Sequence, residues 1–170
     1  EGLGFSGVIK AVMQFDESFW SERAQDLGFL FADTAFPTWW TQLPEKNGMI
    51  TGWMAGPAAS EKKDLPKDEL LQQALNSLAQ IFSVDVPLLK QKLVAWHITN
   101  WTIDPFTKGA YAYEKVTSIH AKRVLNTPVE NTLFFAGEAL CEGPERGTVE
   151  GAFISALEVV KKTAPQSEAV

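Results

Sequence analysis

The sequence predicts an α+β fold in which a mixed β-sheet is flanked by helices. Alternating apolar residues over 8–15 predict a half-buried strand, and the runs 28–32 and 49–55 predict further strands. Apolar residues at helical spacing over 70–82 predict a long amphipathic helix, and a second such stretch lies near the C-terminus. These strand and helix patterns together place the chain in the α+β class.

The N-terminal part contains the predicted strands and the turns between them. Over Val8–Phe15 every second residue is apolar, as in a strand with one buried face. Pro37, Pro44 and the pair Asn47–Gly48 separate the next strands, and an Asn-Gly pair is a strong hairpin signal. We therefore expect neighbouring strands on either side of residues 47–48.

The central part predicts two helices and a returning strand. Asp64 or a neighbour caps the first helix, and Pro66 lies in its first turn. The apolar stripe of this helix consists of Leu70, Leu71, Ala74, Leu75, Leu78, Ile81 and Phe82. A short helix begins at Pro87, and residues 92–101 return as a strand.

The tryptophans divide into core residues and residues that line a site. Trp20, Trp53 and Trp96 fall in strand-like patterns, which predicts core positions. Trp39 and Trp40 are adjacent, so in a strand they point to opposite faces and one of them could line a pocket.

Residues 133–138 combine an apolar run with a glycine and a carboxylate. The four residues Leu133 to Ala136 are apolar without alternation, which predicts a strand buried on both faces, as in a parallel sheet. Gly137 has no Cβ and lets a ligand come close to the backbone. The two acceptor oxygens of Glu138 suit a pair of sugar hydroxyls. The segment predicts a nucleotide-binding edge.

A glycine-led helix follows this segment. After Gly147 and Thr148, we expect a helix from Val149 with one buried face and with Lys161 and Lys162 near its end, before Pro165. That predicted buried face is Val149, Ala152, Phe153, Ala156 and Val160. The free N–H groups of the first helical turn would point toward the end of the preceding strand. From spacing alone, an ordinary strand and helix without a ligand fit equally well.

Composition excludes several classes of function. The 170 residues are 45% apolar and carry a net charge of −6, which argues against nucleic acid as a partner. The apolar runs are shorter than the ~18 residues that span a bilayer. The single cysteine, Cys141, fits a reducing compartment and predicts a cytoplasmic protein. His97 and His120 have no partner at metal-ligand spacing, so no metal site is predicted.

The run FFAGEALCEGPERGTVEGAFISALEVV resembles the C-terminal signature of the flavin-dependent amine oxidases, the family of monoamine and polyamine oxidases. The stretches GVIKAVMQFDESFW at 7–20, 39–56 and WTIDPFTKGAYAY at 101–113 are similar to segments of the same family and occur in the same order. The resemblance implies an FAD cofactor that is contacted at the two ends of that signature. The implied contacts are Gly137, Glu138, Gly147, Thr148 and Val149.

The resemblance also assigns roles around the flavin ring. Trp101 corresponds to a tryptophan that packs beside the flavin, and Tyr111 to an aromatic residue of the substrate cage; these two are the implied catalytic residues. Ala110 stands where covalently flavinylated members have a cysteine, which implies non-covalent FAD. Thr148 replaces a second cage aromatic, so a cage of two rings is not expected.

The resemblance further implies a domain arrangement and a function. Residues 1–131 would be part of the substrate-binding domain, and 132–170 the last strand and helix of an FAD-binding domain. No G-x-G-x-x-G fingerprint follows a first strand at the N-terminus, where the family has its ADP-binding unit, and the chain starts at Glu1. We therefore expect a C-terminal fragment whose partner is the missing N-terminal FAD-binding half.

The expected reaction is oxidation of a small-molecule amine by hydride transfer to flavin, with the isolated fragment inactive. The alternatives are a related flavoprotein of the protoporphyrinogen oxidase or carotenoid desaturase type, and a non-catalytic interaction module left by truncation.

Overall fold

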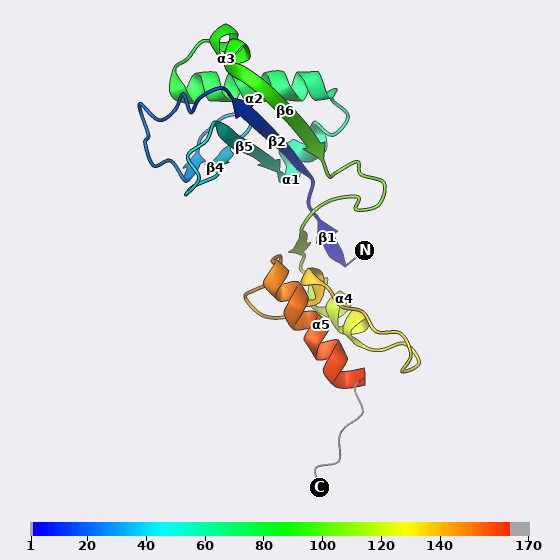
Figure 1. Ribbon diagram of the computed structural model, residues 1–170. Coiled ribbons are helices and arrows are strands. Elements are labelled where there is room, and N and C mark those ends of the chain that lie inside the picture. Colours follow the sequence, from blue (N-terminus) through cyan, green and yellow to red (C-terminus); the bar gives the residue numbers. More distant parts are fainter. Residues whose placement is uncertain (1, 164–170) are drawn as a thin grey trace. The chain divides into compact units, whose positions relative to one another are not determined.

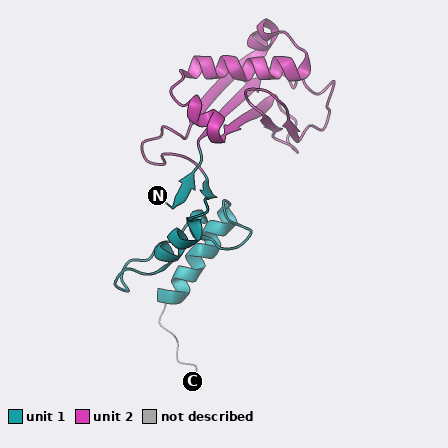
Figure 2. Ribbon diagram, turned by 180° about the vertical axis from the view of Figure 1, so that it is seen from behind, with its two compact units in different colours: residues 1–6, 111–170 teal, residues 7–110 magenta. Residues whose placement is uncertain are grey.

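The computed structural model describes residues 2–163, and contacts within the chain divide it into two units (Figure 2). One unit comprises residues 7–110, and the other comprises residues 1–6 together with 111–170. The predicted helix stop at Pro165 and the tail after Ala164 lie outside the described residues.

The unit of residues 7–110 contains a five-stranded antiparallel sheet with the strand order β3-β4-β5-β2-β6 (Figure 1). Its strands are β2 (Val8–Phe15), β3 (Phe29–Phe31), β4 (Thr38–Thr41), β5 (Met49–Ala55) and β6 (Leu93–Asn100). β2 lies between β5 and β6, with Ala11 opposite both Gly52 and Ile98. The predicted hairpin is confirmed, because β4 pairs with β5 across the segment that contains Asn47 and Gly48.

Three helices belong to the same unit, namely α1 (Gly56–Glu61), α2 (Lys67–Phe82) and α3 (Val86–Lys92). The α2 helix lies against one face of the sheet (Figure 1). The residue that caps α2 is Pro66 rather than Asp64, and no side chain bonds to the first turn. Asp68 and Glu69 lie in that turn instead, where their negative charges interact favourably with the positive end of the helix dipole and stabilise the helix.

The core of this unit lies between α2 and one face of β2. Ile9, Ala11 and Met13 are fully buried there, as the alternation predicted. The residues that α2 buries are Leu70, Ala74, Leu75, Ser77, Leu78 and Phe82. The predicted stripe was therefore largely correct, with Leu71 and Ile81 only partly buried at its margin.

The tryptophans of this unit separate as strand alternation requires. Trp39 is completely buried, whereas Trp40 is only half-buried and lies under the ammonium of Lys10, 5.7 Å from the ring centre. Trp20 is buried and Trp53 half-buried, but Trp96 on the edge strand β6 is 38% exposed. The core prediction for Trp96 was wrong, because an edge strand has a neighbour on one side only.

The second unit contains a two-stranded antiparallel sheet of β1 (Leu3–Phe5) and β7 (Ala112–Glu114), the helices α4 (Ser118–Asn126) and α5 (Val149–Thr163), and the 3-10 helix η1 (Glu138–Leu140). The buried hydroxyl of Ser118 joins the sheet to α4. It accepts from the N–H of Lys115 and donates to the carbonyl of Gly2 at 2.8 Å.

The α+β class is confirmed, and the strand pairs within residues 2–163 are antiparallel throughout rather than mixed in direction. The predicted buried strand at 133–136 does not form. Leu133 makes a single bridge to Val129, and Leu133 and Phe135 are 56% and 46% exposed. A strand needs a hydrogen-bonding neighbour along its length, and apart from the bridge at Leu133 none pairs with this segment among the described residues.

The helix predicted from Val149 is confirmed, but its predicted buried face is not buried in this unit. Val149, Phe153 and Val160 are 74%, 65% and 56% exposed. The buried residues of α5 are Gly151 and Ser155 instead, on the side that contacts η1. The helical spacing correctly indicated an apolar stripe, and no described element of this unit covers that stripe.

Candidate functional site

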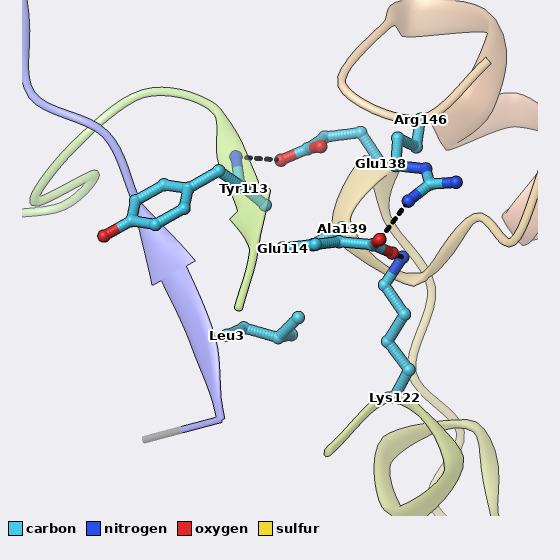
Figure 3. Close-up of a pocket in the computed structure, with 8 residues that line it drawn as sticks. Leu3, Tyr113, Glu114, Lys122, Glu138, Ala139 and Arg146 are labelled. Carbon is cyan, nitrogen blue, oxygen red and sulfur yellow. Dashed lines mark hydrogen bonds and ion pairs between the residues drawn. The ribbon is translucent and has the colours of Figure 1, made fainter. Parts of the chain in front are cut away.

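Glu138 is held by the strand β7 and has one unused oxygen. Its Oε1 accepts a hydrogen bond from the N–H of Ala112 at 3.0 Å (Figure 3). Its Oε2 is buried, and no group among the described residues donates to it. A buried carboxylate oxygen without a partner is unfavourable unless a ligand or a water supplies the donor. Glu138 is therefore prepared to accept a hydrogen bond from a bound group.

Gly137, next to this carboxylate, is attached to α5. Its N–H donates to the hydroxyl of Ser155, which is buried, at 3.2 Å. Gly137 has a φ of +155°, a conformation that side-chain-bearing residues rarely adopt. The hydrogen bond to Ser155 and the contacts of η1 with α5 bring Gly137 and Glu138 to one side of this helix. Thr148, at the start of α5, lies seven residues before Ser155, which is about 10 Å along the helix axis.

The start of α5 is a capped helix terminus. Gly147 has a φ of +77° and turns the chain into the helix. The Thr148 hydroxyl then accepts from the N–H of Gly151 at 3.0 Å, which is the bond that an N-cap residue makes. Gly151 is required here, because a Cβ at this position would lie 2.4 Å from the carbonyl oxygen of Glu145. Thr148 and Val149 are exposed at this terminus.

A cluster of charged residues lies beside Glu138 (Figure 3). The carboxylate of Glu114 in β7 pairs with Lys122 of α4 at 2.8 Å and with Arg146, which directly precedes Gly147. The Lys122 ammonium is buried and also donates to the carbonyl of Cys141 at 3.2 Å. The hydrogen bond from Lys122 and the positive charges of Lys122 and Arg146 hold the pKa of Glu114 below its ordinary value, against a smaller effect of desolvation.

The cavity next to Glu138 is small. It has a volume of about 10 Å³ and is lined by Glu138, Glu114, Lys122 and Arg146 together with residues of β1 and β7. This volume accommodates about one water molecule, whereas cofactor sites occupy several hundred Å³. This cavity alone therefore cannot enclose a flavin, although the unpartnered Oε2 and the helix terminus fit the hydroxyl and anionic groups of a nucleotide.

Two of the predicted site residues, Trp101 and Ala110, belong to the other unit, at the two ends of one loop. The carbonyl of Trp101 accepts from the N–H of Gly109 at 2.9 Å, which closes this loop. Trp101 is 37% exposed and Ala110 half-buried. Asp104 stabilises the loop from within. Its Oδ1 accepts hydrogen bonds from the N–H of Phe106 and from both the N–H and the hydroxyl of Thr107. These bonds lower the pKa of Asp104.

Tyr111 is the first residue of the longer segment of the second unit, where its carbonyl accepts from the N–H of Ser6 and its side chain is 44% exposed. In that unit Gly137 and Glu138 lie beside α5. Gly147 and Thr148 directly precede this helix, and Val149 is its first residue. The sequence reasoning missed Asp104, Glu114, Lys122, Arg146 and Ser155. Only Asp104 had a local signal, an Asp-Pro turn with a threonine three residues later.

Within residues 2–163, three or more potential metal ligands come together nowhere, and no helix is both long enough and apolar enough to span a bilayer. His97 lies in β6 and His120 in α4, where it is exposed. Cys141 is a free thiol and is buried at the end of η1.

Comparison with known proteins identifies the class to which this arrangement belongs. A family model described as flavin containing amine oxidoreductase matches residues 1–162. The chain therefore belongs to the family of flavin-containing amine oxidoreductases, and the resemblance stated from the sequence is confirmed.

Individual relatives come from plants and animals. The chain is 33% identical to lysine-specific histone demethylase 1 homolog 3 of Arabidopsis thaliana over 91% of its length, and 27% identical to lysine-specific histone demethylase 2 of Homo sapiens over 95%. It is 29% identical over 92% to a protein named "Probable polyamine oxidase 4" of Arabidopsis thaliana. The chain spans only 10%, 20% and 30% of the lengths of these three relatives, respectively.

Proposed function

We propose that this chain is the C-terminal part of an FAD-dependent oxidoreductase that oxidises an amine. The observation that carries the proposal is the buried Oε2 of Glu138, which has no donor among the described residues and lies in a segment attached to α5. Membership of the flavin-containing family supports FAD as the group that supplies this donor.

Each predicted contact then has a physical task. Glu138 would accept a hydrogen bond from a sugar hydroxyl, since a carboxylate is suited to hydroxyls and unsuited to phosphates. The positive end of α5, at Thr148 and Val149, would stabilise negative charge on the cofactor. Gly137 and Gly147 leave the backbone accessible at both places. Ala110 offers no thiol, so the FAD would be held without a covalent bond.

On the substrate side, the resemblance gives Trp101 a place beside the flavin and Tyr111 a place in the aromatic substrate cage, where a ring face would contact the amine. When bound, FAD supplies the chemistry, because flavin accepts the hydride from the carbon next to the amine nitrogen. Thr148 adds no aromatic ring to this cage. The term "amine" in the family description and the name of the polyamine oxidase relative favour an amine over a porphyrin or polyene substrate.

The proposal also concerns the rest of the protein. The relatives are three to ten times longer than the part that this chain matches, which supports an FAD-binding half supplied by further sequence. Residues 132–170 would complete that FAD-binding domain, and residues 1–131 would belong to the substrate-binding domain. The isolated chain would lack full activity. A cytoplasmic location and the absence of nucleic-acid partners stay predictions from composition.

The test is the substitution Glu138→Gln in the full-length protein, with Glu130→Gln as the matched control. Both changes remove one carboxylate from the same unit, but the Glu130 side chain is exposed and makes no hydrogen bond or ion pair among the described residues. Charge-assisted hydrogen bonds contribute roughly 1.5–3 kcal/mol. Since glutamine keeps one acceptor oxygen, we expect Glu138→Gln to weaken FAD binding about tenfold.

The flavin absorption of the purified proteins and titration of FAD into the apoprotein measure this effect. Wild type and Glu130→Gln should be equally yellow, and Glu138→Gln should lose FAD on dialysis. Unchanged flavin occupancy in Glu138→Gln would contradict the assignment of this residue. A colourless full-length protein that ignores added FAD would instead favour the interaction module, and turnover of a porphyrin or polyene but no amine would favour the related flavoproteins.

A further inference from the structure

The short strand β7 supports both parts of the candidate cofactor site in its unit. At its first residue, the N–H of Ala112 holds the carboxylate of Glu138 at 3.0 Å. At its last residue, the carboxylate of Glu114 pairs with Arg146, the residue before the turn at Gly147 that leads into α5. The two end residues of this three-residue strand therefore hold the carboxylate and the helix terminus to a common support.

The pair of Glu114 and Arg146 is itself held firmly. Lys122 has its ammonium buried between Glu114 Oε1 and the carbonyl of Cys141, which follows η1 directly. Glu114 is therefore fixed by a buried cation and keeps its other oxygen, Oε2, for Arg146. Arg146 also donates from Nε to the carbonyl of Gly143 at 3.4 Å, so that its fork joins β7 to the loop before α5.

We propose that Glu114 and Arg146 form a positioning pair, which fixes the start of α5 relative to the strand that holds Glu138. The pair would not touch the cofactor itself and would affect FAD binding only through the position of α5. That effect on FAD binding rests on the proposed function. The ordering of the first turn of α5 by Arg146 does not depend on the proposed function and can be tested without a cofactor.

Arg146 is the better residue to substitute. Removing Glu114 would leave the buried Lys122 ammonium without its anion, which destabilises the whole unit. Arg146→Gln keeps the pair of Glu114 and Lys122 and removes only the link to α5. Arg123→Gln is a matched control, because Arg123 is exposed on α4 and its guanidinium makes no hydrogen bond or ion pair among the described residues. Arg146→Lys retains the charge and should rescue part of the effect.

Two measurements are made on the full-length protein. Hydrogen exchange without FAD reports the first turn of α5 at the amides of Gly151 and Ala152, which bond to the side chain and the carbonyl of Thr148. Titration with FAD at low salt and at 1 M salt reports the cofactor. For a half-exposed ion pair we expect Arg146→Gln to speed exchange and to weaken FAD binding roughly two- to fivefold, with the difference from wild type shrinking at high salt.

The outcomes separate the inference from the proposed function. Unchanged exchange at Gly151 and Ala152 in Arg146→Gln, or the same loss in Arg123→Gln, would overturn the positioning pair. If exchange speeds up but FAD affinity does not change, the effect on the cofactor is overturned. A wild-type protein that binds no FAD refutes the proposed function, while the exchange experiment still decides whether Arg146 orders α5.

Discussion

Gly52, in the middle of the central strand β5, makes room for a buried tryptophan. It lies opposite Trp39 of β4, and a Cβ built at Gly52 would come within 2.6 Å of the indole ring. Trp39 cannot give way easily, because it is fully buried and its Nε1 donates to the carbonyl of Phe36 at 2.7 Å. Gly52→Ala therefore forces a methyl group into a packed core against a ring that a hydrogen bond holds in place.

The magnitude follows from the size of the overlap. Overpacking by one methyl group in a core that must shift costs about 1–3 kcal/mol. Alanine at a strand position should otherwise be more favourable than glycine by up to about 1 kcal/mol, so a net loss can only come from the overlap. For the unit of residues 7–110, the loss corresponds to a fall in melting temperature of roughly 4–14 °C. Thermal unfolding followed by tryptophan fluorescence measures it.

Gly28→Ala is the control for this substitution. Gly28 precedes β3, and a Cβ there would meet only one side-chain atom of Leu43, at 4.0 Å. We expect this change to alter the melting temperature little or to raise it. A melting temperature of Gly52→Ala equal to that of wild type would show that the indole can move, and would refute the reasoning from the fixed ring.

Two further predictions concern the second unit. Thr148→Ala should destabilise the protein by about 1 kcal/mol because it removes the cap on the Gly151 amide, and Thr148→Ser should not; thermal unfolding of both variants checks this. The lowered pKa of Glu114 means that its ion pairs stabilise the folded state above the ordinary glutamate pKa of about 4.3 and lose this effect as the pH falls through the lower folded-state pKa. The stability difference between wild type and Glu114→Gln, followed by unfolding at several pH values, should accordingly be constant near neutrality and shrink in acid.

Local patterns predicted most of the larger unit. The alternation over 8–15 and the helical spacing over 70–82 each reported one buried face, and the two faces pack on each other. Each of these two patterns lies within a single strand or helix, so it identifies the buried face of that element without information about its neighbours. The cap at Pro66 and the exposure of Trp96 depend on the neighbouring chain, and these two details were predicted incorrectly.

The candidate site was predictable only where its signals are local. The glycines at 137 and 147 were recognisable by type, and both adopt positive φ. The pair of Glu114 and Arg146 joins residues 32 positions apart, and no periodicity connects them. Nothing in the sequence pattern of α5 distinguishes Ser155, although its hydroxyl accepts a hydrogen bond from the N–H of Gly137. Such contacts become visible only in three dimensions.

The two largest errors have one physical cause. The run 133–136 was expected to be a buried strand, and the stripe of Val149, Phe153 and Val160 was expected to be a buried face, yet both are largely exposed in their unit. Both patterns report apolar surface that needs a neighbour, and neither identifies that neighbour. Because the chain matches at most 30% of the three relatives named above, the simplest common cover is further sequence of an FAD-binding domain, as proposed. The patterns would then have identified apolar surfaces whose partners lie in the missing FAD-binding half that the resemblance implies.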